Sequence, residues 1–396
     1  MCRGQRVLEL EFPRHSHQQR YVSIILFRSY SEFGESIRSH VSGSVAIIVG
    51  LMFLSGWQSL VAAQVTAAQE SSYDLRIHVL PERHSMEVHG TWKLPVAVQD
   101  RQTIEFFLSP KMKDLSLSVV APPGHDSHNS LTSKEAGGDT KWTLSLKSPI
   151  PAGQAATFEF SYVSDGTPAP QLNISPEGSF AGSGGELWYP QTSFSSREIG
   201  NLRFEVPPGE TVVSNGKLLS NTGQEASGRF TFRVSNPVKF AFAAGKYNIL
   251  RGGSGPVYFA LYLLHPSPQA QRIAGGCSKI VTALAAEFGD LPQRQISLVE
   301  VDFRSRVLGA GEYGFILADT SQFDSEFDPV YWAHELGHQW WGDLVRSMSN
   351  TPGAELLTEG MAQFGALEDH RIDRRAGSGR TATPHGISRE SPGFGR

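Results

Sequence analysis

Residues 331–345 read YWAHELGHQWWGDLV and contain an H-E-x-x-H run formed by His334, Glu335 and His338. On a helix, residues four apart lie on one face one turn apart, so both imidazoles can reach the same metal ion. Zinc binds imidazole and carboxylate ligands, and a catalytic zinc site keeps one of its four positions for water. Glu335 is placed to take a proton from that water. The run therefore predicts a site for one zinc ion per chain.

The residues around this run favour a helix over 330–345, with Pro329 in its first turn. Gly337 costs a helix about 1 kcal/mol relative to alanine, so we expect it to serve close packing. The alternative is an ordinary amphipathic helix with two histidines four apart by coincidence. Four aromatic residues that can bury the remaining faces of the helix weaken this alternative: Tyr331, Trp332, Trp340 and Trp341.

A third protein ligand is needed, and Glu359 is the candidate, 21 positions after His338. We expect it on a helix that Thr351-Pro352 opens and that runs to about Glu368. Glu355 lies four residues earlier on the same helix face and competes for the role. Either glutamate could instead be a solvated helix carboxylate. We favour Glu359 because three protein ligands plus water complete the zinc pattern.

The segments HELGHQWWGDLV and LLTEGMAQF together resemble the alanyl-aminopeptidase-type zinc metallopeptidases, which are gluzincins. In that family eighteen residues separate the second histidine from the glutamate, whereas twenty separate His338 from Glu359 here. The two extra residues can lie in the loop around 348–353, where short insertions cost little. The resemblance implies a zinc peptidase in which zinc-activated water attacks a peptide bond, with Glu335 as general base.

The family also has a Gly-x-Met-Glu-Asn strand whose glutamate binds the free α-amine of the substrate. Here Gly309, Ala310, Gly311, Glu312 and Tyr313 stand upstream of the H-E-x-x-H run. The resemblance implies that Glu312 is the amine anchor, with Gly309 and Ala310 in the substrate-binding strand, and that the substrate is a peptide with a free N-terminus. Gly311 and Tyr313 depart from the pattern. A carboxylate near the metal would attract an ammonium group; the alternative is a loop carboxylate without a ligand.

The remaining sequence predicts a multidomain fold. Alternating apolar and polar residues predict half-buried strands throughout 69–250, and hence an all-β sandwich or saddle. Apolar residues at intervals of three to four then predict a helix over about 268–288, followed by a strand over 296–303. The resemblance implies that residues 251–370 form a thermolysin-like α/β zinc peptidase domain that is C-terminally incomplete.

Both ends of the chain differ from this pattern. The apolar run VAIIVGLMFL predicts a signal peptide over 44–68, and hence export to the periplasm or the outside. The alternatives are a buried helix or an uncleaved anchor over 44–63. We expect contact with a membrane only through such an anchor. Residues 1–43 form an N-terminal extension that we interpret as an over-extended start. Residues 371–396 contain few large apolar side chains, so we expect disorder there.

Composition excludes several classes of protein. The 35 Lys+Arg and 39 Asp+Glu give a net charge of −4, whereas a dedicated nucleic-acid binder is usually basic. Two cysteines, Cys2 and Cys277, are too few for a disulfide framework or a thiolate zinc cluster. The sequence has no uninterrupted apolar stretch of ~18 residues, which excludes a conventional multi-span membrane protein. It does not predict the oligomeric state.

Two alternatives to an aminopeptidase remain. In the family a tyrosine well downstream of the third ligand stabilises the oxyanion, and a helical domain closes the cleft. The chain ends before either, and neither Tyr313 nor Tyr331 occupies the matching position. A non-catalytic protein that binds zinc, a peptide or another partner is therefore one alternative, and an endopeptidase is the other.

Overall fold

The computed structural model describes residues 71–124, 129–136, 138–194, 196–222, 228–304, 307–345, 353–354 and 356–367. These residues all belong to one compact unit, Thr66–Arg396. The predictions for 1–43, 44–68 and 371–396 lie outside the described residues. Within the described part of the chain, no helix has the length and apolar character that crossing a membrane requires.

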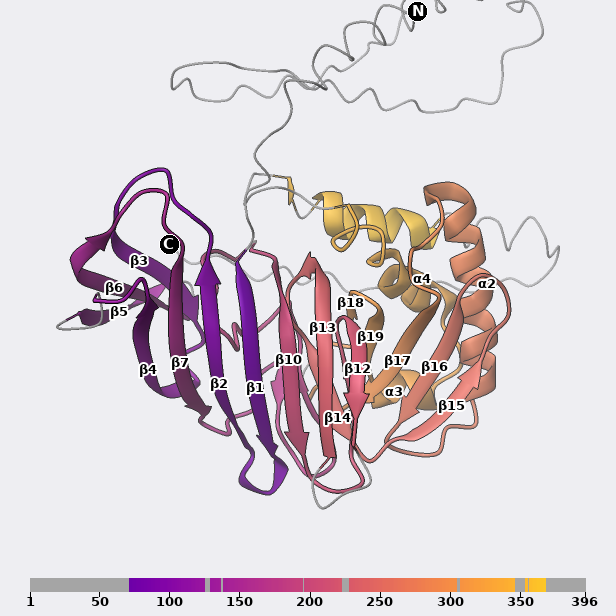
Figure 1. Ribbon diagram of the computed structural model, residues 1–396. Coiled ribbons are helices and arrows are strands. Elements are labelled where there is room, and N and C mark those ends of the chain that lie inside the picture. Colours follow the sequence, from indigo (N-terminus) through magenta and orange to yellow (C-terminus); the bar gives the residue numbers. More distant parts are fainter. Residues whose placement is uncertain are drawn as a thin grey trace, which may run out of the picture. The chain divides into compact units, whose positions relative to one another are not determined.

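The first half of the described chain is built around a seven-stranded sheet with the order β12-β13-β10-β1-β2-β7-β4 (Figure 1). β1 pairs antiparallel with β2 and parallel with β10. The predicted alternation is present, since every second residue of β1 is buried. The strands of this sheet are β1 (Ser72–Leu80), β2 (Ser85–Leu94), β4 (Met112–Ala121), β7 (Ala156–Ser164), β10 (Glu198–Val206), β12 (Lys217–Asn221) and β13 (Gly228–Val238).

Two smaller sheets complete this β-rich part, with the orders β11-β14-β9-β8 and β3-β6-β5. Aromatic side chains fill the core that the three sheets share, among them Trp92, Phe158 and Trp188. One 3-10 helix, η1 (Pro81–Arg83), follows β1. The strands of the smaller sheets are β3 (Arg101–Leu108), β5 (Ser130–Ala136), β6 (Asp139–Ile150), β8 (Leu172–Asn173), β9 (Ser179–Ala181), β11 (Thr211–Ser214) and β14 (Phe242–Gly245).

The second half contains a five-stranded mixed sheet with the order β15-β16-β17-β19-β18. The inner pairs β16–β17 and β17–β19 are parallel, and the outer strands β15 and β18 run antiparallel to their neighbours. The sheet strands are β15 (Asn248–Gly252), β16 (Tyr258–Leu263), β17 (Gln295–Val301), β18 (Gly309–Glu312) and β19 (Phe315–Asp319).

Helix α2 (Ala270–Phe288) connects β16 to β17, close to the predicted bounds of helix and strand. Its apolar face, which includes Ile273, Cys277 and Leu284, packs in one core with β16, β17 and α4 (Pro329–Gly337). A short helix, α3 (Thr320–Asp324), follows β19. The π-helix η2 (Leu356–Gly360) continues directly into helical residues 361–367.

Helix α4 begins as predicted but ends early. The Asp328 side chain accepts a hydrogen bond from the Val330 backbone N–H, and Pro329 occupies the first turn. The expected continuation to residue 345 is wrong, because the helix ends at Gly337. Gly342 has φ 110°, a left-handed conformation that favours glycine. Its N–H donates a hydrogen bond to the Val345 carbonyl in a turn that reverses the chain.

Helical residues 356–367 agree with the helix expected before Glu368, although Thr351, Pro352 and Glu368 lie outside the described residues. This helical segment packs very closely on α4. A Cβ added to Gly337 would lie 3.1 Å from Ala362 Cα, so the expectation that Gly337 serves close packing is confirmed.

One carboxylate lies inside the aromatic core of the β-rich part. Glu198 in β10 is fully buried and accepts a 2.8 Å hydrogen bond from the Tyr189 hydroxyl. The same hydroxyl accepts from the Phe240 backbone N–H. Burial raises the pKa of Glu198 to about 7, because removal from water disfavours the charged carboxylate.

We therefore expect Glu198 to make the protein less stable as the pH rises. Its folded-state pKa of about 7 exceeds the ordinary 4.5, so between these pH values the unfolded chain loses the proton first. Deprotonation then favours unfolding, by an amount on the order of 3 kcal/mol at pH 8. Urea unfolding from pH 4 to pH 8 should show a smaller loss of stability for Glu198→Gln than for the unmodified protein. Glu159→Gln, at an exposed position on β7, is the control, and equal slopes for all three proteins would contradict the prediction.

Candidate active site

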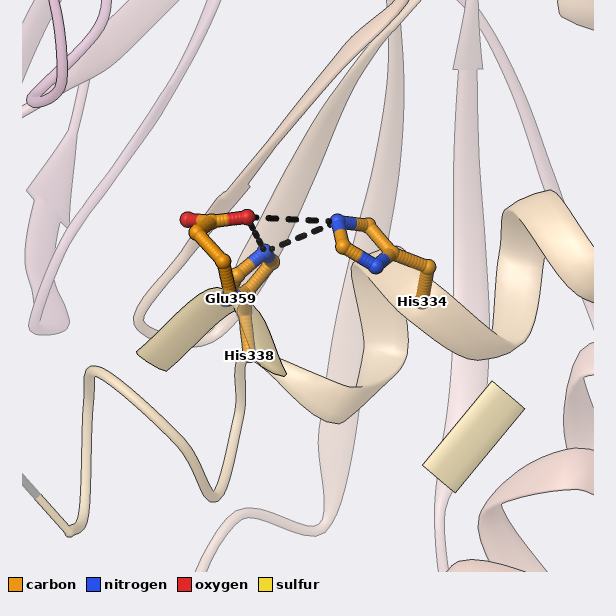
Figure 2. Close-up of side chains that lie close together, drawn as sticks. All are labelled: His334, His338 and Glu359. Carbon is orange, nitrogen blue, oxygen red and sulfur yellow. Dashed lines mark hydrogen bonds and ion pairs between the residues drawn. The ribbon is translucent and has the colours of Figure 1, made fainter. Parts of the chain in front are cut away.

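Helix α4 brings the two predicted histidine ligands together. His334 and His338 are one turn apart, and their Nε2 atoms lie 3.3 Å from each other. Figure 2 shows both rings directed toward the same point. Two Nε2 atoms at this distance can both coordinate one metal ion, as the four-residue spacing predicts.

Glu359 completes the group from η2. Its Oε2 atom lies 3.5 Å from His334 Nε2 and 3.6 Å from His338 Nε2 (Figure 2). The chain thus brings together one ligand atom from each of the three predicted residues. The twenty-residue spacing does not keep Glu359 from the histidines, and the competing Glu355 lies outside the described residues.

These three atoms fit a zinc ion. Four-coordinate zinc with bonds of 2.0–2.2 Å to nitrogen and oxygen holds its ligand atoms about 3.3–3.5 Å apart. The observed separations of 3.3, 3.5 and 3.6 Å are close to this range. Two imidazoles and one carboxylate are also a donor set that zinc accepts.

The protonation of His338 and Glu359 also suits metal binding, because a ligand imidazole must be neutral and a ligand carboxylate ionised. The Trp341 carbonyl lies 3.1 Å from His338 Nδ1, so it favours the tautomer that carries the proton there and leaves Nε2 free. Burial lowers the pKa of His338, which keeps its ring neutral as a ligand must be. The Glu359 carboxylate raises the pKa of His334, and His334 in turn lowers the pKa of Glu359.

Glu335 lies beside the ligand group and is almost completely buried, with 7% of its surface exposed. Burial raises the pKa of this carboxyl group to about 7. A Cβ added to Gly309 would lie 2.6 Å from Glu335 Oε1, so the backbone of β18 passes directly over this carboxyl group. A carboxyl group that titrates near neutral pH can both take and give a proton.

Glu312 ends β18 and is buried. Its Oε1 atom accepts a 2.7 Å hydrogen bond from the backbone N–H of Ser183, and burial raises the pKa of Glu312 to about 7. Ser183 follows β9, and its neighbour Gly184 donates to Gln171 Oε1. The sequence does not predict the roles of Ser183 and Gln171, because their link to Glu312 comes from tertiary contact alone.

Gln339 is a third residue of this region whose role the sequence does not predict. It is fully buried, its Nε2 donates to the Glu312 carbonyl at 2.8 Å, and its Oε1 accepts from the Gly314 N–H at 2.9 Å. Its position directly after His338 was the available signal. Glycine at position 311 departs from the family pattern. The fold explains it sterically, because a Cβ there would lie 2.6 Å from His338 Cβ.

All seven predicted site residues line one cleft of about 260 Å³. They are His334, Glu335, His338, Glu359, Gly309, Ala310 and Glu312. Neither Tyr313 nor Tyr331 is among the described residues that line it. The Tyr313 hydroxyl instead hydrogen-bonds Asn236, and that of Tyr331 donates to the Leu308 carbonyl.

Solved structures of M1 zinc metallopeptidases have a similar fold. One from Deinococcus radiodurans is 18% identical with a TM-score of 0.58, and the match covers 77% of this chain and 72% of that one. A mutant from the same organism, bound to a Tyr-Ser-Ala substrate, is 16% identical with a TM-score of 0.59 and the same coverage. A two-domain mutant bound to L-tryptophan is 17% identical with a TM-score of 0.58, again over 77% and 72%. No family model matches the sequence, and no curated protein matches it significantly.

The ligand geometry predicts how zinc affinity responds to the two competing glutamates. Glu359→Ala removes one of the three metal ligands and should weaken zinc binding by at least about 100-fold. This is more than the loss of a residue that only hydrogen-bonds a ligand causes. Glu355→Ala should bind zinc like the unmodified protein. Competition with a chelating dye measures both affinities. Loss of zinc in Glu355→Ala with retention in Glu359→Ala would reverse the assignment.

Proposed function

We propose that this chain is a zinc metallopeptidase of the gluzincin type that acts as an aminopeptidase. The observation that carries the proposal is the meeting of the His334, His338 and Glu359 ligand atoms in one cleft with the buried carboxyl groups of Glu335 and Glu312. The fold shared with M1 zinc metallopeptidases supports it, because one of them is described as bound to a Tyr-Ser-Ala substrate.

His334, His338 and Glu359 would hold the metal. Zinc bound by them would polarise the carbonyl of the scissile peptide bond and lower the pKa of water. The Glu335 carboxylate takes the proton from the attacking water as the C–O bond forms. It then gives that proton to the nitrogen that leaves as the C–N bond breaks. Its position under β18 keeps the carboxylate at the cleft wall and out of bulk water.

Glu312 would bind the α-ammonium group of the substrate. A buried carboxylate that faces an ammonium group forms a charge-assisted hydrogen bond, and the Ser183 N–H fixes the orientation of this carboxylate. Since the carboxylate lies in the same cleft as His334, His338 and Glu359, a peptide held there would have its first peptide bond next to this ligand group. Cleavage is thereby limited to the N-terminal residue.

The same proposal covers organisation and location. The mixed sheet with α2 and α4 supports a thermolysin-like catalytic domain over 251–370, preceded by the β-rich domain over 69–250. The apolar run at 45–54 supports export to the periplasm or the outside through a signal peptide over 44–68, or anchoring over 44–63.

A non-catalytic zinc-binding protein is the second candidate. It is favoured by the observation that neither Tyr313 nor Tyr331 is among the described residues that line the cleft, because loss of one oxyanion donor costs about 100-fold to 1,000-fold in rate. Hydrolysis of an aminoacyl reporter that stops in chelator and returns with zinc would exclude this candidate.

The role of Glu335 predicts a separation of metal binding from catalysis. Glu335→Gln keeps the shape of the side chain but not its basicity, so kcat should fall by about 100-fold to 10,000-fold. Zinc content, measured by elemental analysis, should stay the same because Glu335 is not a ligand. Glu287→Gln, at an exposed position on α2, should change neither quantity. Retained activity in Glu335→Gln would refute the proposed base.

The role of Glu312 predicts that the substrate needs a free amine. Acetylation of a peptide N-terminus removes the ammonium group that Glu312 would bind, so cleavage of the acetylated peptide should fall below detection. Chromatography of paired free and acetylated peptides measures this. Cleavage of both at similar rates would show endopeptidase action instead.

A further inference from the structure

Two cations line the candidate active-site cleft. Arg197 directly precedes β10 and Lys239 directly follows β13, so both come from the β-rich part of the chain. They share the cleft wall with Glu312, Glu335 and the ligand group. Both also lie near the amine anchor, since their positive charges act to lower the pKa of Glu312 against the larger effect of burial.

Neither Lys239 nor Arg197 forms an ion pair with another residue in the described part of the chain. Arg197 donates one hydrogen bond from Nη1 to the Ser196 carbonyl, which leaves its other donors available. Burial lowers the pKa of Lys239 to about 8, so its ammonium group is still charged at neutral pH.

Three cleft carboxylates already have roles and are not available to these cations once a peptide is bound. Glu359 would bind the metal, Glu335 would move the proton and Glu312 would bind the substrate amine. Asp343 also lines the cleft. Glu198 and Asp139 act on Lys239 but are not among the described residues that line the cleft, and burial raises their pKa to about 7 and about 6. Two cations beside the substrate amine repel it, unless the substrate brings a negative charge to the same place. A side-chain carboxylate on the first residue of the peptide supplies such a charge next to the α-amine.

We propose that Lys239 and Arg197 bind the side-chain carboxylate of the first substrate residue, so that the preferred substrates are peptides with N-terminal glutamate or aspartate. This inference rests on the proposed aminopeptidase function and specifies its substrate class. Arg197 offers a planar pair of N–H donors that matches a carboxylate, and Lys239 adds a second charge.

The test compares peptides that differ only in this charge. Binding of glutamyl-alanyl-alanine and glutaminyl-alanyl-alanine to zinc-loaded Glu335→Gln protein is measured by calorimetry, which does not depend on turnover. We expect the glutamyl peptide to bind about tenfold more tightly, more than the few-fold that an exposed ion pair contributes. Adding Lys239→Met or Arg197→Gln should reduce the ratio to about threefold or less. Lys239→Arg keeps the charge and should retain the preference, as should Lys93→Met, a change at an exposed lysine on β2.

Hydrolysis of glutamyl, glutaminyl and leucyl reporters by the unmodified protein separates failure of this inference from failure of the proposed function. Equal binding of the two peptides, or a preference that survives loss of both cations, overturns the inference; if the leucyl reporter is still cleaved, the aminopeptidase function stands. If the protein binds none of the peptides and cleaves none of the reporters, the proposed function is overturned, and the substrate preference with it.

Discussion

The close packing of β18 against α4 is the contact on which the candidate site depends. Side chains at 309 and 311 would collide with Glu335 and His338, so glycine at both positions lets the strand lie directly on the helix. Gln339 holds the two together with one hydrogen bond to each side of the turn after β18. This contact places Glu312 in the same cleft as the ligand group.

The spacing of the sequence predicts those parts of the site that lie on one helix. The four-residue spacing of His334 and His338 predicts their common face, because residues one turn apart on a helix lie on the same side. Glu359 is predictable by ligand chemistry although its spacing departs from the family pattern, since a loop can absorb two residues. The end of α4 at Gly337 is not predictable by periodicity, because apolar residues continue to 345 while the turn at Gly342 reverses the chain.

Tertiary contacts supply the rest, and they leave little trace in the sequence. Ser183 donates to Glu312 across 129 positions of the chain, and Arg197 and Lys239 reach the cleft from the β-rich part. In the cleft, burial raises the pKa of Glu312 and Glu335 alike to about 7. Such a site holds two carboxyl groups near their protonation midpoint at neutral pH, and cations that approach them favour the charged forms.

X-ray absorption at the zinc edge, on the full chain loaded with one equivalent of zinc, tests the central claim most directly. A four-coordinate ion with two imidazole nitrogens at about 2.0–2.1 Å and oxygen in the remaining positions is the predicted result. The signal of one imidazole should disappear in His338→Ala. A spectrum of zinc surrounded by water alone, or one that His338→Ala leaves unchanged, would contradict the assignment of His334, His338 and Glu359 as the metal ligands.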